Sequence, residues 1–185
     1  MRLQKTRYAL ACSMTFDPKL PDQNRDNGAT LVPDSHTWRR TTLGQRAMVA
    51  VRAAAILRAR ADEFAQPVHN ETGKVIEEAR AEVALGAEII DAYARVAVAP
   101  AAAGDDRARS AEPSLEGRPL LFCVLPANCS YDQLARLSAP NLLAGNIVMV
   151  KHTGAVPKAA IAFEQLWLEA GAPVGAFANL LIAYD

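Results

Sequence analysis

A chain of 185 residues has room for one ordinary domain, or for a helical hairpin followed by part of a larger α/β domain. Lys plus Arg number 20 and Asp plus Glu number 20, so the formal charge is zero and neither nucleic acid nor an anionic membrane is an expected partner. No apolar run approaches the roughly 20 residues that cross a bilayer, and the early apolar stretch is too short for a signal peptide. The three cysteines follow neither a zinc pattern nor a disulfide framework. We therefore expect a soluble, cytoplasmic protein without a metal site.

Residues 1–40 are predicted to form an irregular N-terminal arm. They contain Pro18, Pro21, Gly28 and Pro33 but no sustained apolar period. The remaining residues, 41–185, are predicted to form one structural unit.

Two long amphipathic helices are predicted at the start of this unit, over residues 42–66 and 73–98. Apolar residues recur every three or four positions in both segments, and Thr42 and Gln45 have the spacing of a capping box. Pro67 is expected to interrupt the first helix. The two segments together predict a helical hairpin, and the Ala-, Gly- and Asp-rich residues 100–119 predict a linker or a poorly formed ribbon.

Residues 120–183 are predicted to alternate between strands and helices. Three short apolar runs, at 120–125, 147–150 and 177–183, predict strands that are buried on both faces. One helical pattern ends near Gly145, with Pro140 expected to break or restart it, and another begins at Pro157 and ends near Gly171. This βαβαβ order predicts part of a parallel, doubly wound sheet, so the expected fold class is α/β.

Four short motifs resemble motifs of the aldehyde dehydrogenase superfamily, in the same order along the chain. They are Glu71-Thr72-Gly73-Lys74, Leu125-Pro126-Ala127-Asn128-Cys129-Ser130, the block from Ala139 to His152, and Ala170-Gly171-Ala172-Pro173-Val174-Gly175. The resemblance covers residues from about Trp38 to Asp185. It implies the N-terminal part of the family's NAD(P)-binding domain, with a partial Rossmann-like sheet. Trp38 to Thr41 and the pair Lys151-His152 look most like the succinate-semialdehyde dehydrogenase branch.

The resemblance also implies a dinucleotide site, for NAD or NADP, at the carboxyl ends of the strands. Asn128 would donate its side-chain amide to the oxyanion that forms from a small aldehyde substrate, which makes it the implied catalytic residue. Lys151 would contact the ribose hydroxyls or a 2′-phosphate. Gly154 stands where many NAD-preferring relatives carry Glu, which slightly favours NADP. The implied coenzyme contacts are Leu125, Pro126, Ala127, Asn128, Lys151, Thr153 and Gly154.

Simpler interpretations of these residues remain open. Asn128 can end a strand and begin a turn, and Lys151 can leave its strand into solvent. Cys129 is not expected to be a nucleophile, because it occupies the position of a motif Phe and no His or Lys beside it would clearly lower its pKa. Cys123 and Trp167 are expected to lie in the core.

The implied activity is NAD(P)-dependent oxidation of an aldehyde, with succinate semialdehyde as the expected substrate, to a carboxylic acid. The sequence stops at Asp185, before the positions where the family carries a Gly-Ser-x-x-x-Gly segment, a general-base Glu and a nucleophilic Cys. We therefore expect a truncated form that is inactive alone. The alternatives are a non-catalytic fragment that binds nucleotide or docks on another subunit, in a homo- or hetero-oligomer, and a degenerate gene product.

Overall fold

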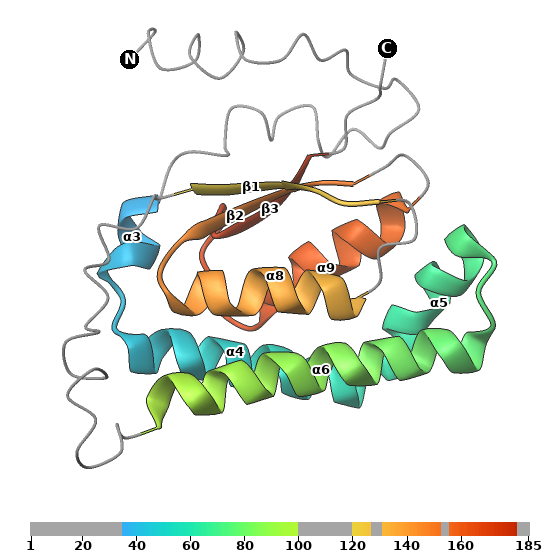
Figure 1. Ribbon diagram of the computed structural model, residues 1–185, viewed down its shortest axis with the longest axis horizontal. Coiled ribbons are helices and arrows are strands. Elements are labelled where there is room, and N and C mark those ends of the chain that lie inside the picture. Colours follow the sequence, from blue (N-terminus) through green and yellow to red (C-terminus); the bar gives the residue numbers. More distant parts are fainter. Residues whose placement is uncertain (1–34, 100–119, 127–130, 153–155, 181–185) are drawn as a thin grey trace, which may run out of the picture.

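A three-stranded parallel sheet carries two layers of helices on one of its faces (Figure 1). The computed structural model describes residues 35–99, 120–126, 131–152 and 156–180. The α/β fold class with a partial parallel sheet is confirmed. The elements are α3 (Ser35–Arg40), α4 (Leu43–Ala59), α5 (Ala61–Thr72), α6 (Ile76–Val98), β1 (Leu120–Val124), α8 (Tyr131–Leu143), β2 (Ile147–Lys151), α9 (Pro157–Glu169) and β3 (Phe177–Leu180).

The strands lie in the order β1-β2-β3, and helices α8 and α9 connect them. Both helices lie on the same face of the sheet, because successive right-handed crossovers that move in one direction place their helices on one side. Helices α4 and α6 form a second layer beneath them (Figure 1). Among the described residues, no helix is long and apolar enough to span a membrane.

The two faces of the sheet differ in burial. Val148, Val150 and Phe177, on the face that the helices cover, are each at most 2% exposed. On the opposite face of β1, Phe122 is 45% and Val124 is 56% exposed, and no described helix packs there (Figure 1). The prediction that all three strands are buried on both faces is therefore wrong for β1. An apolar run does not reveal that its strand lies at an edge of the described sheet with helices on one side only.

The end of the predicted N-terminal arm is helical. Residues 35–40 form α3, and Trp38 within it is 2% exposed. The Trp38 indole donates a hydrogen bond to the Leu142 carbonyl at 3.1 Å, which ties α3 to the end of α8. One buried aromatic residue anchors this short helix. A single tryptophan does not create the repeating apolar pattern from which a helix is predicted. The predicted linker over 100–119 lies outside the described residues.

The helix expected over 42–66 differs from the observed one at its carboxyl end. Its start has the predicted capping box, because the Thr42 hydroxyl accepts from the Gln45 N–H at 3.2 Å while the Gln45 side chain accepts from the Thr42 N–H at 2.8 Å. The chain then kinks at Arg60 and continues as α5 through Pro67 to Thr72. Pro67 removes the helical donor to the Glu63 carbonyl, but Glu63 is exposed, so water can reach that carbonyl.

Pro140 likewise lies within a continuous helix, where a break or restart was expected. Helix α8 runs from Tyr131 to Leu143 through Pro140. The carbonyl that loses its helical donor belongs to Arg136, which is exposed. Nearby, the Ser138 hydroxyl donates to the Leu134 carbonyl at 2.6 Å. The proline is tolerated because the lost bond faces solvent while the opposite side of α8 is packed.

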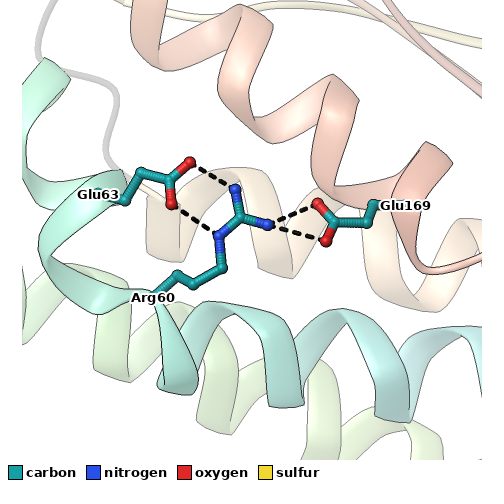
Figure 2. Close-up of polar contacts among 3 residues, drawn as sticks. All are labelled: Arg60, Glu63 and Glu169. Atoms are coloured by element: carbon teal, nitrogen blue, oxygen red, sulfur yellow. Dashed lines mark hydrogen bonds and ion pairs between the residues drawn. The ribbon is translucent and has the colours of Figure 1, made fainter.

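Arg60 lies at the kink between α4 and α5, and its side chain connects this kink to the end of α9 (Figure 2). Its guanidinium donates to both carboxylate oxygens of Glu169, at 2.8 and 2.6 Å, and to Glu63 through Nε at 2.7 Å. Hydrogen bonds from these two carboxylates raise the pKa of Arg60, and the same contact lowers the pKa of Glu63. All three side chains are partly exposed, so water screens their charges and the network adds little to the free energy of unfolding. Its main effect is to orient the helices.

Two further arginines of α4 hold the carboxyl ends of the crossover helices. Arg46 is 6% exposed and donates to the Leu143 carbonyl at 2.7 Å and to the Thr41 carbonyl, and burial lowers its pKa. Its guanidinium packs on Gly145, which has φ of +84° and ends α8 as predicted. Arg52 reaches the Ala170 carbonyl at the end of α9, at 3.5 Å. Helix α4 therefore holds the carboxyl ends of α8 and α9, at the edge of the sheet where β2 and β3 begin.

Gly86 marks a close approach of α6 to α8. A Cβ atom added there would lie 3.2 Å from the Tyr131 carbonyl oxygen and 3.3 Å from the Tyr131 Cβ. Gly86→Ala is expected to lower the free energy of unfolding by about 1 kcal/mol. Overpacking costs roughly 1–3 kcal/mol, which exceeds the gain of about 1 kcal/mol in helix propensity.

Gly44→Ala is the matched control, because the nearest atom to its added Cβ is the Thr42 hydroxyl at 3.9 Å. It is expected to raise the free energy of unfolding by about 0.5 kcal/mol through helix propensity alone. Urea denaturation followed by circular dichroism measures both changes. A stabilising Gly86→Ala would contradict the tight contact between α6 and α8.

Candidate coenzyme site

The carboxyl ends of β1 and β2 bring two of the predicted site segments together. Val124 pairs with Lys151 in the sheet register, and the Leu125 N–H donates to the Lys151 carbonyl at 3.0 Å. Leu125 is half-buried and Pro126 is exposed at the same edge. Open α/β sheets bind their ligands beyond the carboxyl ends of their strands. Leu125, Pro126 and Lys151 therefore share the edge at which a nucleotide would bind.

Lys151 is 5% exposed, so its side chain does not extend into solvent. It lies at the end of β2, between Val124 of β1 and Leu180 of β3 in the register. Removal from water strengthens the attraction of an ammonium group for an anion. A cation held in this way is suited to a phosphate or to ribose hydroxyls.

A second polar group lies at the same end of the sheet, on the side of the helices. Asn179 of β3 is 4% exposed; its backbone N–H donates to the Glu164 carboxylate at 3.1 Å and its side-chain amide donates at 2.9 Å. The amide also donates to the Ala160 carbonyl at 2.6 Å. Burial raises the pKa of Glu164, while the hydrogen bonds from Asn179 oppose the rise. These contacts fix the end of β3 to α9.

His152 is 2% exposed next to this group, and neither ring nitrogen has a hydrogen-bond partner among the residues that the structure describes. Burial lowers its pKa to about 4, although the nearby Asn179 side chain favours the charged form. The imidazole is therefore neutral at pH 7. A small cavity beside it, bounded by Tyr131 and Val156, is far too small for a dinucleotide. His152 is a buried side chain that directly follows the last residue of β2.

Sequence reasoning did not identify Glu164 and Asn179 as a pair. One signal was available, because Asn179 interrupts the apolar run 177–183 and a polar side chain inside a buried strand needs a partner. Its partner lies 15 positions earlier on a helix, where Glu164 looks like one of many surface charges. The pairing therefore required the tertiary structure.

Several predicted residues lie outside the part of the chain that the structure describes. They are Ala127, Asn128, Cys129, Thr153 and Gly154. Cys123 is half-buried, less than expected for a core residue, and burial raises the pKa of its thiol. Trp167 is 1% exposed, as expected for the core. Within the described residues, no group of three His, Cys, Asp or Glu side chains could hold a metal ion.

Comparison with known proteins shows what this arrangement is similar to. The sequence model of the aldehyde dehydrogenase family matches residues 30–183. A succinate-semialdehyde dehydrogenase [NADP(+)] of Deinococcus radiodurans is 35% identical over 147 residues, which are 78% of this chain and 31% of that protein. The succinate semialdehyde dehydrogenase [NAD(P)+] Sad of Escherichia coli K12 is 35% identical over 142 residues, 76% of this chain and 31% of that protein.

Solved structures agree with the sequence comparison. The succinic semialdehyde dehydrogenase of Streptococcus pyogenes, in complex with NADP+, superposes with a TM-score of 0.68 at 31% identity and matches 92% of this chain and 38% of that one. The succinate-semialdehyde dehydrogenase of Burkholderia pseudomallei superposes with a TM-score of 0.62 at 25% identity, over 80% of this chain and 31% of that one. The chain spans about a third of the length of these relatives. It belongs to the aldehyde dehydrogenase family.

Proposed function

We propose that this chain forms the first part of the coenzyme-binding domain of an NAD(P)-dependent aldehyde dehydrogenase that acts on succinate semialdehyde, with NADP as the favoured coenzyme. The relatives named above support the substrate and the coenzyme. The observation that carries the proposal is the buried Lys151 at the carboxyl end of β2, beside Leu125 and Pro126 of the second family motif.

The described residues fit one end of a dinucleotide. Lys151 supplies a positive charge for the ribose hydroxyls or the 2′-phosphate, and the half-buried Leu125 supplies an apolar wall. Of the residues outside the described part, Ala127, Thr153 and Gly154 are proposed as further coenzyme contacts. Asn128 is proposed to contact the coenzyme and to donate its amide to the oxyanion of the reacting aldehyde. When bound, the coenzyme accepts a hydride from the aldehyde carbon.

We further propose that these 185 residues, by themselves, bind coenzyme without oxidising aldehydes. They contain no counterpart of the family's general-base Glu or of its nucleophilic Cys, so two chemical roles have no side chain. Purified polypeptide incubated with succinate semialdehyde and NADP should therefore show no increase in absorbance at the wavelength where NADPH absorbs. Measurable aldehyde oxidation would overturn this part of the proposal.

Lys151→Gln is expected to weaken NADP binding by about 10- to 100-fold, because a charge-assisted contact to a phosphate contributes roughly 1.5–3 kcal/mol. NAD lacks the 2′-phosphate, so its affinity should fall less. Calorimetric titration of the 185-residue polypeptide measures both dissociation constants. Arg95→Gln is the control, since it removes the same charge from α6 where the side chain is 72% exposed.

Two results would contradict this assignment. If the unsubstituted polypeptide gives neither heat nor a thermal shift with NADP, coenzyme binding by these residues is excluded. If Lys151→Gln and Arg95→Gln weaken NADP binding equally, the effect is one of net charge and Lys151 has no specific role.

A second candidate function, docking on another polypeptide chain, is favoured by the exposed face of β1. Phe122 and Val124 expose apolar side chains side by side on a strand, and parallel sheets are normally covered on both faces. Light scattering over a range of protein concentrations tests this candidate. A monomer at every concentration, with no binding to a full-length family member, would exclude it.

A further inference from the structure

The edge of β1 that faces away from β2 carries backbone groups suited to pairing with a further strand. Successive residues of a strand turn their N–H and C=O groups to opposite sides, and the Leu125 N–H donates to the Lys151 carbonyl on the side of β2. By this alternation, Leu120, Phe122 and Val124 turn their backbone groups away from β2. Among the residues that the structure describes, β2 is the only strand that pairs with β1. Such an edge is a template for an additional strand.

The side chains along this edge favour an apolar partner. The sequence of β1 is Leu-Leu-Phe-Cys-Val, which has neither the proline nor the charges that usually prevent pairing at an edge. Phe122 and Val124 are 45% and 56% exposed on the face that α8 and α9 do not cover. A strand added beside them would bond their backbone groups and contact both side chains. Its own large apolar residues should therefore occupy alternate positions.

Residues 8–16 have this pattern, and we call them the arm strand. They lie outside the residues that the structure describes, and they precede residues 30–183, which match the family's sequence model. The predicted N-terminal arm has no period that is sustained along its length, but apolar side chains alternate here with small or hydroxyl side chains. The apolar set is Tyr8, Leu10, Cys12, Met14 and Phe16, and the intervening set is Ala9, Ala11, Ser13 and Thr15. A period of two is typical of a strand with one apolar face.

The arm strand can reach β1, because the arm joins the rest of the chain near the start of β1. The arm leads into α3, and Trp38 of α3 donates to the Leu142 carbonyl at the end of α8. This is the edge of the sheet where Leu120 of β1 pairs with Ile147 of β2 (Figure 1). Residues 17–34 can span up to about 60 Å when extended, whereas a strand of the length of β1 measures only about 17 Å. The connection therefore permits pairing along the whole of β1.

We propose that the arm strand pairs with the free edge of β1 as a fourth strand of the sheet, with its apolar set beside Phe122 and Val124. It would thereby satisfy the backbone groups of β1 and shield the two exposed side chains within one polypeptide. The arm strand would then occupy the surface on which docking of another chain is the second candidate function. The inference does not depend on coenzyme binding.

Hydrogen exchange of single amides in the 185-residue polypeptide tests the pairing. The Phe122 N–H should be protected, and Leu10→Asp should raise its exchange rate about 10- to 100-fold, because a carboxylate among apolar side chains detaches the strand. Leu20→Asp is the matched control, since it makes the same change in the arm between Pro18 and Pro21 and should leave the rate unaltered. The Cys123 N–H faces β2 and is the internal reference. Equal rates for the Phe122 N–H in all three chains would overturn the proposal.

Disulfide formation by Cys12 tests which face the apolar set occupies. Cys123 pairs with Val150 on the face that the helices cover, whereas Phe122 and Val124 lie on the opposite face. Neighbouring strands place facing Cβ atoms about 4.5–5.5 Å apart, so mild oxidation should link Cys12 to Phe122→Cys or to Val124→Cys within one chain. The original chain should not link Cys12 to Cys123. Mass spectrometry of proteolytic peptides identifies the linked pairs.

The other possible occupants give different results. A disulfide between two chains at Phe122→Cys, with a dimer in light scattering, would assign the edge to a second copy and overturn the proposal. Linkage of Cys12 to Cys123 in preference to the introduced cysteines would overturn the proposed face. Absence of any Cys12 disulfide, with a Phe122 N–H rate that Leu10→Asp does not change, would show that the arm strand does not lie there. Because both cysteine substitutions are at exposed positions, circular dichroism should confirm an unaltered fold.

Discussion

Replacing Phe163 by alanine is expected to lower the free energy of unfolding by about 4 kcal/mol, close to the upper range for a large-to-small substitution in a core. Phe163 is 0% exposed and lies at the centre of an aromatic cluster. Its ring centroid is 5.4 Å from Phe177, 5.6 Å from Tyr131 and 6.3 Å from Trp167. The substitution therefore leaves a cavity between the sheet and both crossover helices. Urea denaturation followed by circular dichroism measures the loss.

Phe122→Ala is the matched control for this substitution. It removes the same atoms from β1, but Phe122 is 45% exposed on the face that no described helix covers. Its expected cost is about 1 kcal/mol, because less apolar surface returns to water and no closed cavity forms. Equal losses at the two positions would contradict a core restricted to the helix side of the sheet. Since a domain is stable by only about 5–15 kcal/mol, Phe163→Ala removes a large share of the total.

Acidification is expected to destabilise the fold through His152, by about 3 kcal/mol in total. The folded-state pKa is about 4, below the value of 6.5 for an exposed histidine. Above pH 6.5 the ring is neutral in both states and contributes nothing. As the pH falls below 6.5 the unfolded chain binds a proton that the folded chain does not, so stability declines until the folded state also protonates near pH 4. Between pH 7.5 and pH 5 the decline should be about 2 kcal/mol.

His152→Gln isolates this effect from those of the carboxylates. Glutamine has a similar size and no charge, so the difference between the two proteins cancels contributions that they share. The raised pKa of Glu164 works in the opposite direction, because the folded state then binds a proton more readily than the unfolded state as the pH falls. The unfolding free energy of His152→Gln should therefore depend less on pH between 7.5 and 5. Identical pH profiles would show that His152 is hydrated and titrates normally in the folded protein.

The helical layer beneath the crossovers does more than cover them. At one edge, Arg46 and Arg52 of α4 bind carbonyls at the ends of α8 and α9. At the other edge, Glu71 of α5 binds the start of α9. Both ends of α9 are therefore fixed from outside the βαβαβ unit.

Several local features could be predicted because they depend on residues only a few positions apart. The capping box of Thr42 and Gln45, the glycine end of α8 and the proline start of α9 all follow from hydrogen bonds or backbone angles within one turn. The alternation of apolar runs and helical stripes likewise predicted a parallel α/β sheet. Prediction was weaker at Pro67 and Pro140, because tolerance of an internal proline depends on which side of the helix meets solvent.

The sequence by itself determined the order of the elements, the parallel sheet, the family and the location of Lys151 at a strand end, since motifs and periodicity are properties of neighbouring residues. Only the tertiary structure decided that Lys151 and His152 are buried and that Asn179 pairs with Glu164. The same is true of Glu71, whose partners lie 87 and 88 positions away. Such contacts depend on how separate helices pack, so the residues around a carboxylate do not predict which helix end it will cap.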